Sequence, residues 1–458
     1  MPHDPSQRTF SRRRYAGVAA ALVAVFSPAI YAQSEPQILT LEQAQEIGLA
    51  NRPALKARQL FAATARQTTL QIESARYPWV SGNVTAATAQ RETTVQDGRE
   101  VSLDTRIAAG GLNNPTVLRR DAAGVIVSQL VTDFGRTSSL IQSSRFNEAS
   151  QQQQVNATRA QVLADIADAY FAALEAQAVL QVAQKTLEAR QTLLNRIAAL
   201  TKSKLRSELD VRFAQVNLDE SRLLLLRAQN AVDAAFSHLS TSVGSRDARR
   251  YALVDPPSSE APPADLDPLL TQAIAARPEL VSLRADREAA RKFVDAQKAL
   301  RYPTINAFAA GGVTPIGDER FPRNYGAIGI NLNINLFDGG KITALQQEAR
   351  LRAFAVSENL TEAENTISNA VRIAWLNARA GYENIAISEH LRDAASQALK
   401  LAEARYNLGI TSFVELNQAQ LSAIDAEIGA SRAKYQYLTA RTVLDYQVGT
   451  LNASAAAK

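Results

Sequence analysis

Two sequence motifs recur in the two halves of this chain at a constant spacing, and this duplication limits the folds that the chain can adopt. Arg52-Pro53 returns as Arg277-Pro278, and Arg76-Tyr77-Pro78 returns as Arg301-Tyr302-Pro303, both 225 residues later. Later pairs lie 205 residues apart: Asp133 and Asp338, Gly135 and Gly340, Ala214-Gln215 and Ala419-Gln420, and Val243-Gly244 and Val448-Gly449. The change of offset predicts a longer loop in the first half. Such a repeat predicts a fold built from two copies of one structural unit.

A proline-rich segment at 255–265 separates the two copies. It holds Asp255-Pro256-Pro257 and Ala261-Pro262-Pro263, and prolines favour an extended backbone that a helix cannot continue through. We therefore assign a first structural repeat, a linker, a second structural repeat and a C-terminal tail. These lie at 33–254, 255–265, 266–450 and 451–458.

Residues 1–32 have the features of a secretory signal peptide. A basic cluster from Arg12 to Arg14 precedes an apolar run from Tyr15 to Ile30, and Ala32 is a small residue suited to the cleavage position. The arginines also resemble a twin-arginine signal, but a chain that must be inserted unfolded favours the general export route. The sequence therefore predicts an exported protein.

The mature chain has little net charge and no cysteine. Removing residues 1–32 takes away four arginines and Asp4, which lowers the formal charge from +5 to about +2, so a nucleic-acid partner has no support. The lack of cysteine excludes disulfides, thiolate metal sites and a lipidated N-terminal cysteine. His3, His238 and His390 lack metal-ligand spacing, and no group of catalytic side chains converges. We therefore expect no metal, no cofactor and no enzyme activity.

Each half carries the same order of expected elements: a short helix, a medium helix, two strands around a loop, and two long helices. In the second half we expect helices at 266–276 and 278–300, strands at 303–313 and 325–337, and helices at 341–406 and 412–449. The first long helix of each half runs for over 60 residues without a proline, which gives roughly 100 Å at a rise of about 1.5 Å per residue. Breaks at 203–207 and 409–412 precede the returning helices. The sequence thus predicts two long antiparallel helical hairpins.

The strand expected at 325–337 has the clearest alternation in the chain. Its apolar residues, Ile328, Ile330, Leu332, Ile334 and Leu336, alternate with small or amide residues. A soluble sheet would show the same alternation, so the pattern alone does not identify a membrane strand. The first-half strands, near 80–90 and 125–130, alternate less clearly. After the signal, no run approaches the roughly 18 to 20 apolar residues of a spanning helix, so a membrane crossing would have to use strands.

Asp133-Phe134-Gly135 and Asp338-Gly339-Gly340 stand where a strand is expected to meet a long helix. The first copies the kinase Asp-Phe-Gly triplet, but neither a glycine-rich loop nor a catalytic-loop motif accompanies it. Glycine permits unusual backbone angles and aspartate can cap a helix, so we predict a structural corner in both halves. Tyr77, Trp79 and Tyr302 suit either a membrane-interface belt or ordinary packing.

The segment from Arg405 to Gln420 crosses the expected turn of the second long hairpin. It reads Arg-Tyr-Asn-Leu-Gly-Ile-Thr-Ser-Phe-Val-Glu-Leu-Asn-Gln-Ala-Gln. This segment resembles the hairpin tips of the TolC-type outer membrane efflux proteins, which carry Arg-Tyr-x-x-Gly followed by a serine and an acidic residue. The duplication and the strand placement extend the resemblance over nearly all of the chain after the signal.

The resemblance implies a mainly α-helical fold with a transmembrane β part. In this family three subunits form a twelve-helix α-barrel in the periplasm and a twelve-stranded β-barrel in the outer membrane, and the four strands expected per chain fit that sum. Closure leaves no strand edge in lipid. The implied protein is a homotrimer in outer-membrane lipid that extends into the periplasm.

The resemblance also implies a function and partners. The trimer would be the exit duct of a tripartite exporter, joined by a periplasmic adaptor (membrane fusion) protein to an inner-membrane transporter. The cargo stays open between small molecules and a polypeptide exported by type I secretion. A periplasmic coiled-coil scaffold or adaptor with no membrane-spanning part is the alternative from another class.

The family's tunnel closes at its periplasmic end, and motif positions imply which residues close it here. Tyr406 matches the latch tyrosine, Asp210 the first-hairpin acid, and Glu415 the pore-facing acid of the second hairpin. A threefold ring of Glu415 would bring like charges together, although both acids would also suit the first turn of a helix. Thr411 replaces an arginine that some members carry, and Gln418 replaces a second acid.

Both hairpin tips are implied to contact the adaptor. The candidate contacts are Leu205, Arg206 and Ser207 on the first tip and Gly409, Ile410 and Thr411 on the second. Lys204 stands where the second tip has Gly409. We therefore expect the first turn to be stiffer or to take a different path.

Overall fold

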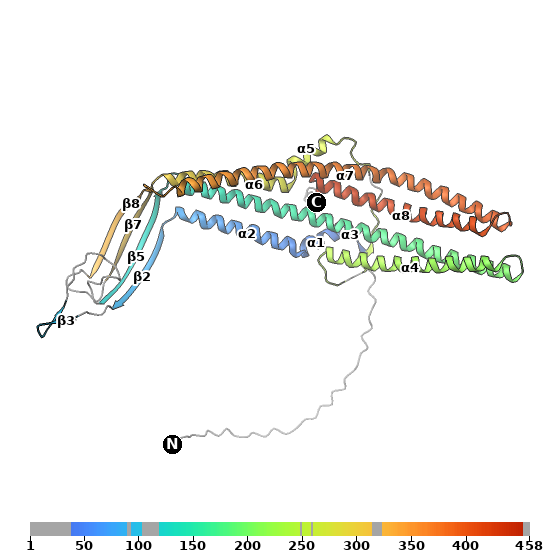
Figure 1. The fold of residues 1–458 in the computed structure, drawn as a ribbon, viewed down its shortest axis with the longest axis horizontal. Helices are drawn as coiled ribbons and strands as arrows, with labels where there is room; N and C mark the ends of the chain where they lie inside the picture. The colour runs from blue at the N-terminus through green and yellow to red at the C-terminus, as the bar shows by residue number, and fades with distance from the viewer. Residues whose placement is uncertain are drawn as a thin grey trace, which may run out of the picture.

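The computed structural model describes most of the chain after the expected signal peptide. The described residues are 38–88, 93–102, 119–247, 250–257, 260–313 and 323–451. The signal peptide expected at 1–32 lies outside them, as does the expected tail beyond residue 451. The molecule is elongated, with long helices side by side and a small sheet at one end (Figure 1).

The helices follow the same order in both halves. The first half forms α1 (Leu41–Asn51), α2 (Pro53–Glu73), α3 (Arg136–Lys202) and α4 (Glu208–Ser242). The second half forms α5 (Asp267–Ala276), α6 (Pro278–Lys298), α7 (Lys341–Asn407) and α8 (Phe413–Val448). Both α3 and α7 have 67 residues, and α4 and α8 return along them (Figure 1). The two predicted hairpins are therefore present. In the described part of the chain, no helix combines the length and the apolar character that a bilayer crossing requires.

The duplicated Arg-Pro motif closes the base of each hairpin. Pro53 and Pro278 stand in the first turns of α2 and α6, where a helix needs no N–H donor. The guanidinium of Arg52 donates to the carbonyl of Thr241 near the end of α4 at 3.1 Å. The guanidinium of Arg277 donates to the side-chain oxygen of Gln447 near the end of α8. A cation at a helix C-terminus is electrostatically favourable. The motif therefore joins the start of α2 to the end of α4 in the first half, and the start of α6 to the end of α8 in the second half.

The duplicated Val-Gly motif completes this joint. Gly244 and Gly449 follow α4 and α8 with left-handed φ angles of 81° and 85°. A β-carbon at Gly244 would lie 3.1 Å from Asn51, and one at Gly449 would lie 3.4 Å from Arg277. Both the turn and the close approach favour glycine, which explains why this dipeptide recurs.

Four strands form one antiparallel sheet in the order β2-β5-β7-β8. They are β2 (Trp79–Thr88), β5 (Arg119–Thr132), β7 (Thr304–Val313) and β8 (Asn324–Asn333). Because β5 pairs with β7, the two halves share the sheet, and β2 and β8 are its edges. A hairpin that the sequence analysis did not predict, β3 (Thr93–Gln96) and β4 (Arg99–Ser102), lies between β2 and β5.

The last strand ends earlier than the sequence predicts. We expected a strand to residue 337, whereas β8 ends at Asn333, which pairs with Thr304 at the start of β7. Pro303 comes directly before Thr304 and has no N–H for a sheet. The 3-10 turn η2 (Ala299–Arg301) precedes it. Among the described residues, no strand therefore pairs with residues 334–337, although their alternation continues.

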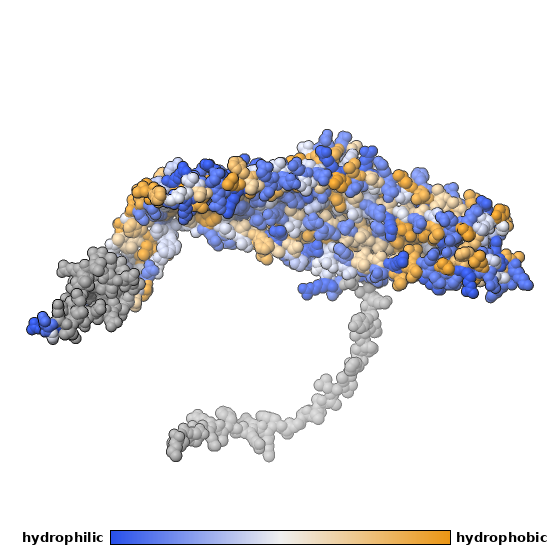
Figure 2. Space-filling view, in the orientation of Figure 1, coloured by the Kyte–Doolittle hydropathy of each residue, from blue (hydrophilic) through white to orange (hydrophobic). Residues whose placement is uncertain are grey.

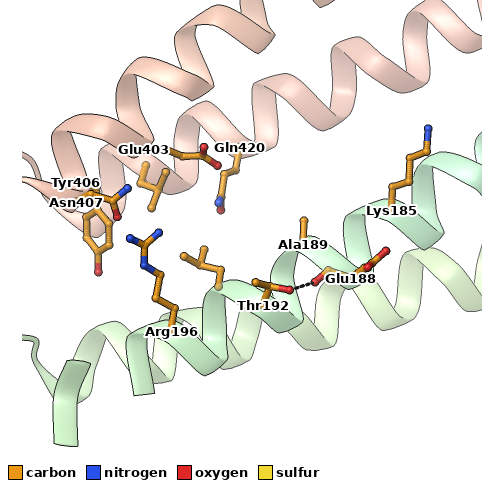
Figure 3. A pocket seen from close by; sticks show the side chains of 11 residues that line it. Lys185, Glu188, Ala189, Thr192, Arg196, Glu403, Tyr406, Asn407 and Gln420 are labelled. Carbon is orange, nitrogen blue, oxygen red and sulfur yellow. Dashed lines mark hydrogen bonds between the residues drawn. The ribbon is translucent and has the colours of Figure 1, made fainter. Parts of the chain in front are cut away.

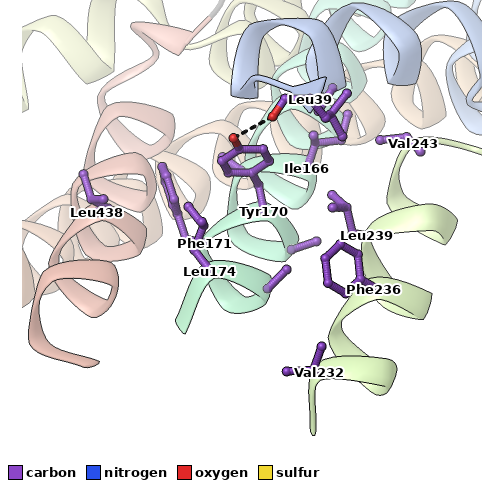
Figure 4. Packing of buried hydrophobic residues seen from close by; sticks show 14 of the residues in the cluster. Leu39, Ile166, Tyr170, Phe171, Leu174, Val232, Phe236, Leu239, Val243 and Leu438 are labelled. Atoms are coloured by element: carbon purple, nitrogen blue, oxygen red, sulfur yellow. Dashed lines mark hydrogen bonds between the residues drawn. The ribbon is translucent and has the colours of Figure 1, made fainter. Parts of the chain in front are cut away.

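A buried tyrosine organises the core between α1, α3 and α4 (Figure 4). The hydroxyl of Tyr170 lies 2.9 Å from the carbonyl of Leu39 and 2.7 Å from that of Val254. These carbonyls flank the short parallel strands β1 (Ile38–Leu39) and β6 (Ala252–Leu253). Tyr170 thus fixes the ends of the first half to the middle of α3.

The proline-rich linker is bound to the long helices of the second half. We call its described residues, 255–257 and 260–265, the strap. The side chains that hold it are Lys434, Tyr437 and Arg441 of α8 and Trp375 of α7. Tyr437 and Arg441 both donate to the carbonyl of Glu260, while Lys434 pairs with the carboxylate of Asp255 at 2.7 Å. The extended linker is therefore a fixed part of the helical body.

Candidate functional site

One side of the sheet exposes an apolar stripe. Ile328 and Ile330 of β8 are 89% and 74% exposed, and Val84 of β2 is similarly open. Figure 2 shows hydrophobic residues along this end of the molecule, whereas the helical body carries a mixed surface. Nothing in the described part of the chain covers the stripe.

The corners between sheet and helix are built from aspartate and glycine, as predicted. The carboxylate of Asp338 accepts hydrogen bonds from the N–H groups of Gly340 and Ile342, both at 2.8 Å. These bonds, led by that from Ile342, lower the pKa of Asp338. In the first half the carboxylate of Asp133 accepts from the N–H of Thr137 at 2.7 Å. Both copies cap a long helix, which explains the Asp-x-Gly pattern without phosphate chemistry.

The two hairpin tips turn with the same backbone geometry although their residues differ. Gly409 has a φ of 75°, and the next N–H, of Ile410, donates at 3.0 Å to the carbonyl five residues earlier. Lys204 has a φ of 58°, and the N–H of Leu205 makes the equivalent bond at 2.9 Å. This is the Schellman closure of a helix. The turn at Lys204 is thus not redirected, and its lysine adopts a left-handed conformation that costs about 1 to 2 kcal/mol.

Tyr406 lies between the two hairpins and joins them. Its side chain is only 3% exposed, and Phe413 packs edge-on against its ring at 6.0 Å. The guanidinium of Arg206, from the first hairpin, lies 4.2 Å from the ring centroid and donates to the carbonyl of Tyr406. Arg206, which we expected at the adaptor surface, therefore makes its main contacts inside the subunit.

Asp210 approaches Tyr406 without bonding to it. The hydroxyl of Tyr406 is buried and has no hydrogen-bond partner among the described residues. Burial raises the pKa of Tyr406, the charge of Asp210 raises it further, and Arg206 lowers it. The N–H of Asp210 donates to the hydroxyl of Ser207 at 3.2 Å, so Ser207 caps α4. The described residues of one subunit therefore supply no hydrogen-bond partner for the hydroxyl of the predicted latch tyrosine.

Glu415 is bound by its own hairpin in this conformation. Its carboxylate pairs with Arg405 at 3.2 Å and accepts a hydrogen bond from the hydroxyl of Thr411. Arg405 and Glu415 are both about half exposed. The remaining tip candidates, Leu205, Ser207, Gly409 and Ile410, are exposed at the end of the molecule.

A groove of about 460 Å³ runs between α3 and the second hairpin near the tips (Figure 3). Side chains from α3, α7 and α8 line it, among them Lys185, Glu188, Thr192, Arg196, Glu403, Tyr406 and Gln420. Charges of both signs face the groove, which suits a polar protein segment better than an apolar ligand. In the part of the chain that is described, no cluster of three or more His, Cys, Asp or Glu side chains is arranged for a metal ion.

A buried polar network beside this groove joins α3, α4 and α8. Arg190 is 5% exposed, and its Nη1 donates to the side-chain oxygens of Asn417, at 3.2 Å, and Gln420. The amide of Asn217 donates to the same oxygen of Asn417 at 2.7 Å. Burial lowers the pKa of Arg190, and the charge of Glu220 partly opposes this.

Our sequence analysis missed this network, although a signal was present. The buried side chains of α3 include Ala183, Thr186, Arg190 and Ile197, which follow the three-and-four spacing of a helical core stripe. Arg190 is the charged residue on that stripe. A charge at a periodic apolar position indicates a buried polar contact, but its partners lie more than 200 residues away in the sequence.

The architecture defines the class of this protein. Two long helical hairpins continue into a four-stranded sheet that exposes an apolar stripe, and among the described strands β2 and β8 form its edges. This is the arrangement of an elongated outer-membrane channel subunit. The chain belongs to the outer membrane efflux protein family, whose model matches residues 46–245 and 269–450.

Relatives and solved structures agree with this family. Outer membrane protein TolC of Salmonella enteritidis is 23% identical over 353 residues, which cover 73% of this chain and 72% of TolC. Alkaline protease secretion protein AprF of Pseudomonas aeruginosa is 26% identical over 326 residues, 69% of this chain and 66% of AprF. The outer membrane protein VceC of Vibrio cholerae has the same fold, with a TM-score of 0.75 at 18% identity over 89% of this chain and 96% of VceC. The protein is an outer-membrane channel whose helical part extends into the periplasm.

Proposed function

We propose that three copies of this chain form the exit duct of a tripartite exporter. The open sheet carries this proposal, because in the part of the chain that is described β2 and β8 each have one side without a partner strand. An unpaired backbone group in hydrocarbon costs several kcal/mol, so an open four-stranded sheet cannot stay in a bilayer. Pairing β8 of one subunit with β2 of the next removes every edge and turns the apolar stripe toward lipid.

The helical body supports the same ring. Within a subunit α3 packs against α8, which leaves α4 and α7 on the outside. Exposed apolar residues follow both outer helices: Leu209, Phe213, Val216, Leu223 and Leu226 on α4, and Ile387, Leu391 and Leu401 on α7. Contact between α4 of one subunit and α7 of the next is a head-to-tail interface, which closes when the rotation completes a circle. Sheet and helices therefore give the same subunit order.

The hairpin tips are the proposed surface for a periplasmic adaptor. Their exposed residues and the charged groove above them offer backbone turns, apolar side chains and ionic groups to a helical partner. The adaptor in turn connects the duct to an inner-membrane transporter. Relatives named for secretion of a protease and for outer-membrane efflux leave both cargo classes open. The proposal gives the chain a passive role without catalysis.

We also propose that Tyr406, Asp210 and Glu415 close the duct at its tips. The buried, unpartnered hydroxyl of Tyr406 and the nearby charge of Asp210 support a bond that forms when subunits meet. Glu415 stands in the first turn of α8, where a small movement away from Arg405 would direct its carboxylate into a threefold ring.

A matched pair of substitutions in β8 tests the outer-membrane duct. Ile330→Lys places a charge on the apolar stripe, whereas Asn331→Lys places it on the opposite face of the same strand. A lysine facing lipid costs about 2 to 4 kcal/mol near the membrane centre. We expect Ile330→Lys to abolish heat-labile trimers and outer-membrane fractionation, and Asn331→Lys to retain both. A soluble monomeric wild type without conductance in planar bilayers would instead support the periplasmic scaffold.

A further inference from the structure

Two glycines and a tyrosine form a row across the sheet at its end away from the helices. Gly124 of β5 pairs with Gly312 of β7, and Gly312 pairs in turn with Tyr325 of β8. Residues that pair directly across antiparallel strands lie on the same face of a sheet. On the face that carries Tyr325, the two strands beside it therefore have no side chain in this row.

The ring of Tyr325 lies over both glycines. A β-carbon at Gly124 would overlap the hydroxyl oxygen of Tyr325, and one at Gly312 would lie 2.6 Å from the same oxygen. The side chain thus crosses β7 and reaches β5, so it lies along the sheet instead of standing away from it. Neither glycine has a positive φ, so the backbone conformation does not require glycine here. The space that the ring occupies does require it.

A second aromatic ring lies over a glycine in the same way. Phe308 of β7 pairs with Gly329 of β8, and a β-carbon at Gly329 would lie 2.8 Å from two ring carbons of Phe308. Gly329 follows Tyr325 by four residues in one strand, so both rings lie on the same face. Glycine weakens a strand because it has no side chain to pack. Here its use makes room for flat aromatic rings.

This face is the one that would line the passage of the duct. Ile328 and Ile330 of the apolar stripe alternate along β8 with Gly329 and Asn331. In the proposed ring the stripe turns toward lipid, so the face with Tyr325 turns inward. Tyr325 is 45% exposed in the single chain. Part of its side chain therefore remains open to the passage while the ring lies on the glycines.

We infer that these glycines form slots that hold Tyr325 and Phe308 flat against the wall of the barrel, and that this arrangement sets the width of the outlet. The outlet is the end of the barrel away from the helices, and the inference rests on the proposed trimeric duct. A ring that lies on the wall narrows the passage little, whereas the same ring standing upright would project into it from three subunits. Tyr325 is thereby a residue that determines the size of cargo that can leave.

Filling one slot tests this inference. Gly124→Ala places a methyl group where the hydroxyl of Tyr325 lies, so the ring must leave the wall. Full-length trimers in planar bilayers are exposed to neutral polyethylene glycols of graded size on the side of the sheet, and the largest polymer that enters the outlet is determined from the change in conductance. We expect the cut-off to shift to smaller polymers. The closed tips do not set this cut-off, because a polymer needs only to enter the barrel.

Two further variants separate the ring from the backbone. Gly82→Ala is the matched control, because Gly82 lies next to Asn83, the partner of Gly124 in β2, and so on the opposite face. Among the described residues, a β-carbon at Gly82 meets nothing within 4 Å, and the cut-off should not change. Gly124→Ala combined with Tyr325→Ala removes the displaced ring and should return the cut-off to at least the wild-type value.

The rescue variant matters because a β-carbon at Gly124 would also lie 3.0 Å from the carbonyl oxygen of Gly311. A reduced cut-off that persists in the double variant would show that the strand is distorted, and would overturn the slot. An unchanged cut-off in conducting Gly124→Ala trimers would overturn it as well, and would leave the ring only a role in covering the glycines.

The second slot gives the same comparison if Gly124→Ala does not assemble. Gly329→Ala should lower the cut-off, and its combination with Phe308→Ala should restore it; the absence of either effect would overturn the inference. A wild type that forms no trimers or carries no current would instead overturn the proposed duct itself. A conducting wild type with a cut-off that neither slot affects would overturn the slots alone.

Discussion

Lys204 occupies a backbone conformation that its own side chain disfavours. The neighbouring bonds of the tip impose it, since the same bonds surround Gly409 in the second half. We expect Lys204→Gly to stabilise the first tip by about 1 kcal/mol, because glycine adopts this conformation without a steric penalty. The midpoint of thermal dissociation of the trimer should rise.

The reverse substitution is the control for this prediction. Gly409→Lys introduces the same penalty in the second tip and should lower the midpoint by a similar amount. An unchanged or lower midpoint for Lys204→Gly, or an unchanged midpoint for Gly409→Lys, would show that this backbone conformation does not control the stability of the tips.

Tyr406 and Asp210 give the prediction for the closed tip. Combining Tyr406→Phe with Asp210→Ala removes the buried hydroxyl and the nearby charge while retaining the ring that packs against Phe413. We expect a severalfold rise in single-channel conductance in a planar bilayer. Wild-type conductance from a verified trimer would exclude these residues as the latch.

At the hairpin tip, the position of the turn could be predicted from single residues, whereas the contacts between helices could not. The motif from Arg405 to Glu415 located the turn of the second hairpin, because glycine favours the end of a helix and serine favours the residue before the next helix. The contact of Arg206 with Tyr406 and the hydrogen bond from Arg190 to Asn417 could not be predicted from local residues. Both contacts depend on the register between helices that meet only in the folded chain.

The strap gives a prediction about alkaline pH. Burial, the charge of Asp255 and the side-chain hydrogen bond to Asp255 together raise the pKa of Tyr435 to about 12. Unfolded tyrosine titrates near 10. Between these values the folded chain retains a proton that the unfolded chain has lost, so this contribution is complete below about pH 10 and lost as the pH rises through about 12.

Thermal unfolding between pH 9 and 12 measures this effect. The wild type should lose stability across the window, and Tyr435→Phe should lose less because it has no proton to release there. An identical alkaline loss in both proteins would mean that the strap does not contribute to it.

The sequence predicted the bounds of the helices more accurately than the end of the last strand or the contacts of the strap. The predicted helix bounds lie within about two residues of those observed, since prolines, glycines and turn residues mark their ends locally. The predicted end of β8 was wrong because a strand stops where its neighbour stops, and Pro303, directly before β7, sets that limit. The strap was predicted to be extended, but its attachment to Tyr437 and Trp375 required the folded helices.

For the molecule as a whole, the duplication explains the sheet that the two halves share. Each half contributes two strands of the four-stranded sheet and one hairpin. In the proposed ring, alternation of the halves around the axis would bring β8 to β2 and α7 to α4 of the next subunit.

The equal length of α3 and α7, 67 residues each, has a consequence for how such a duct can change its reach. Both hairpins must end at one level to present a common rim, so the length is specified twice in one gene. An insertion in one helix alone would push its tip forward by about 1.5 Å per residue and rotate it by about 100°. A seven-residue insertion nearly restores the facing of the helix and adds about 10 Å. Lineages that lengthened or shortened the duct would therefore have gained or lost heptads in matched pairs, one in each half.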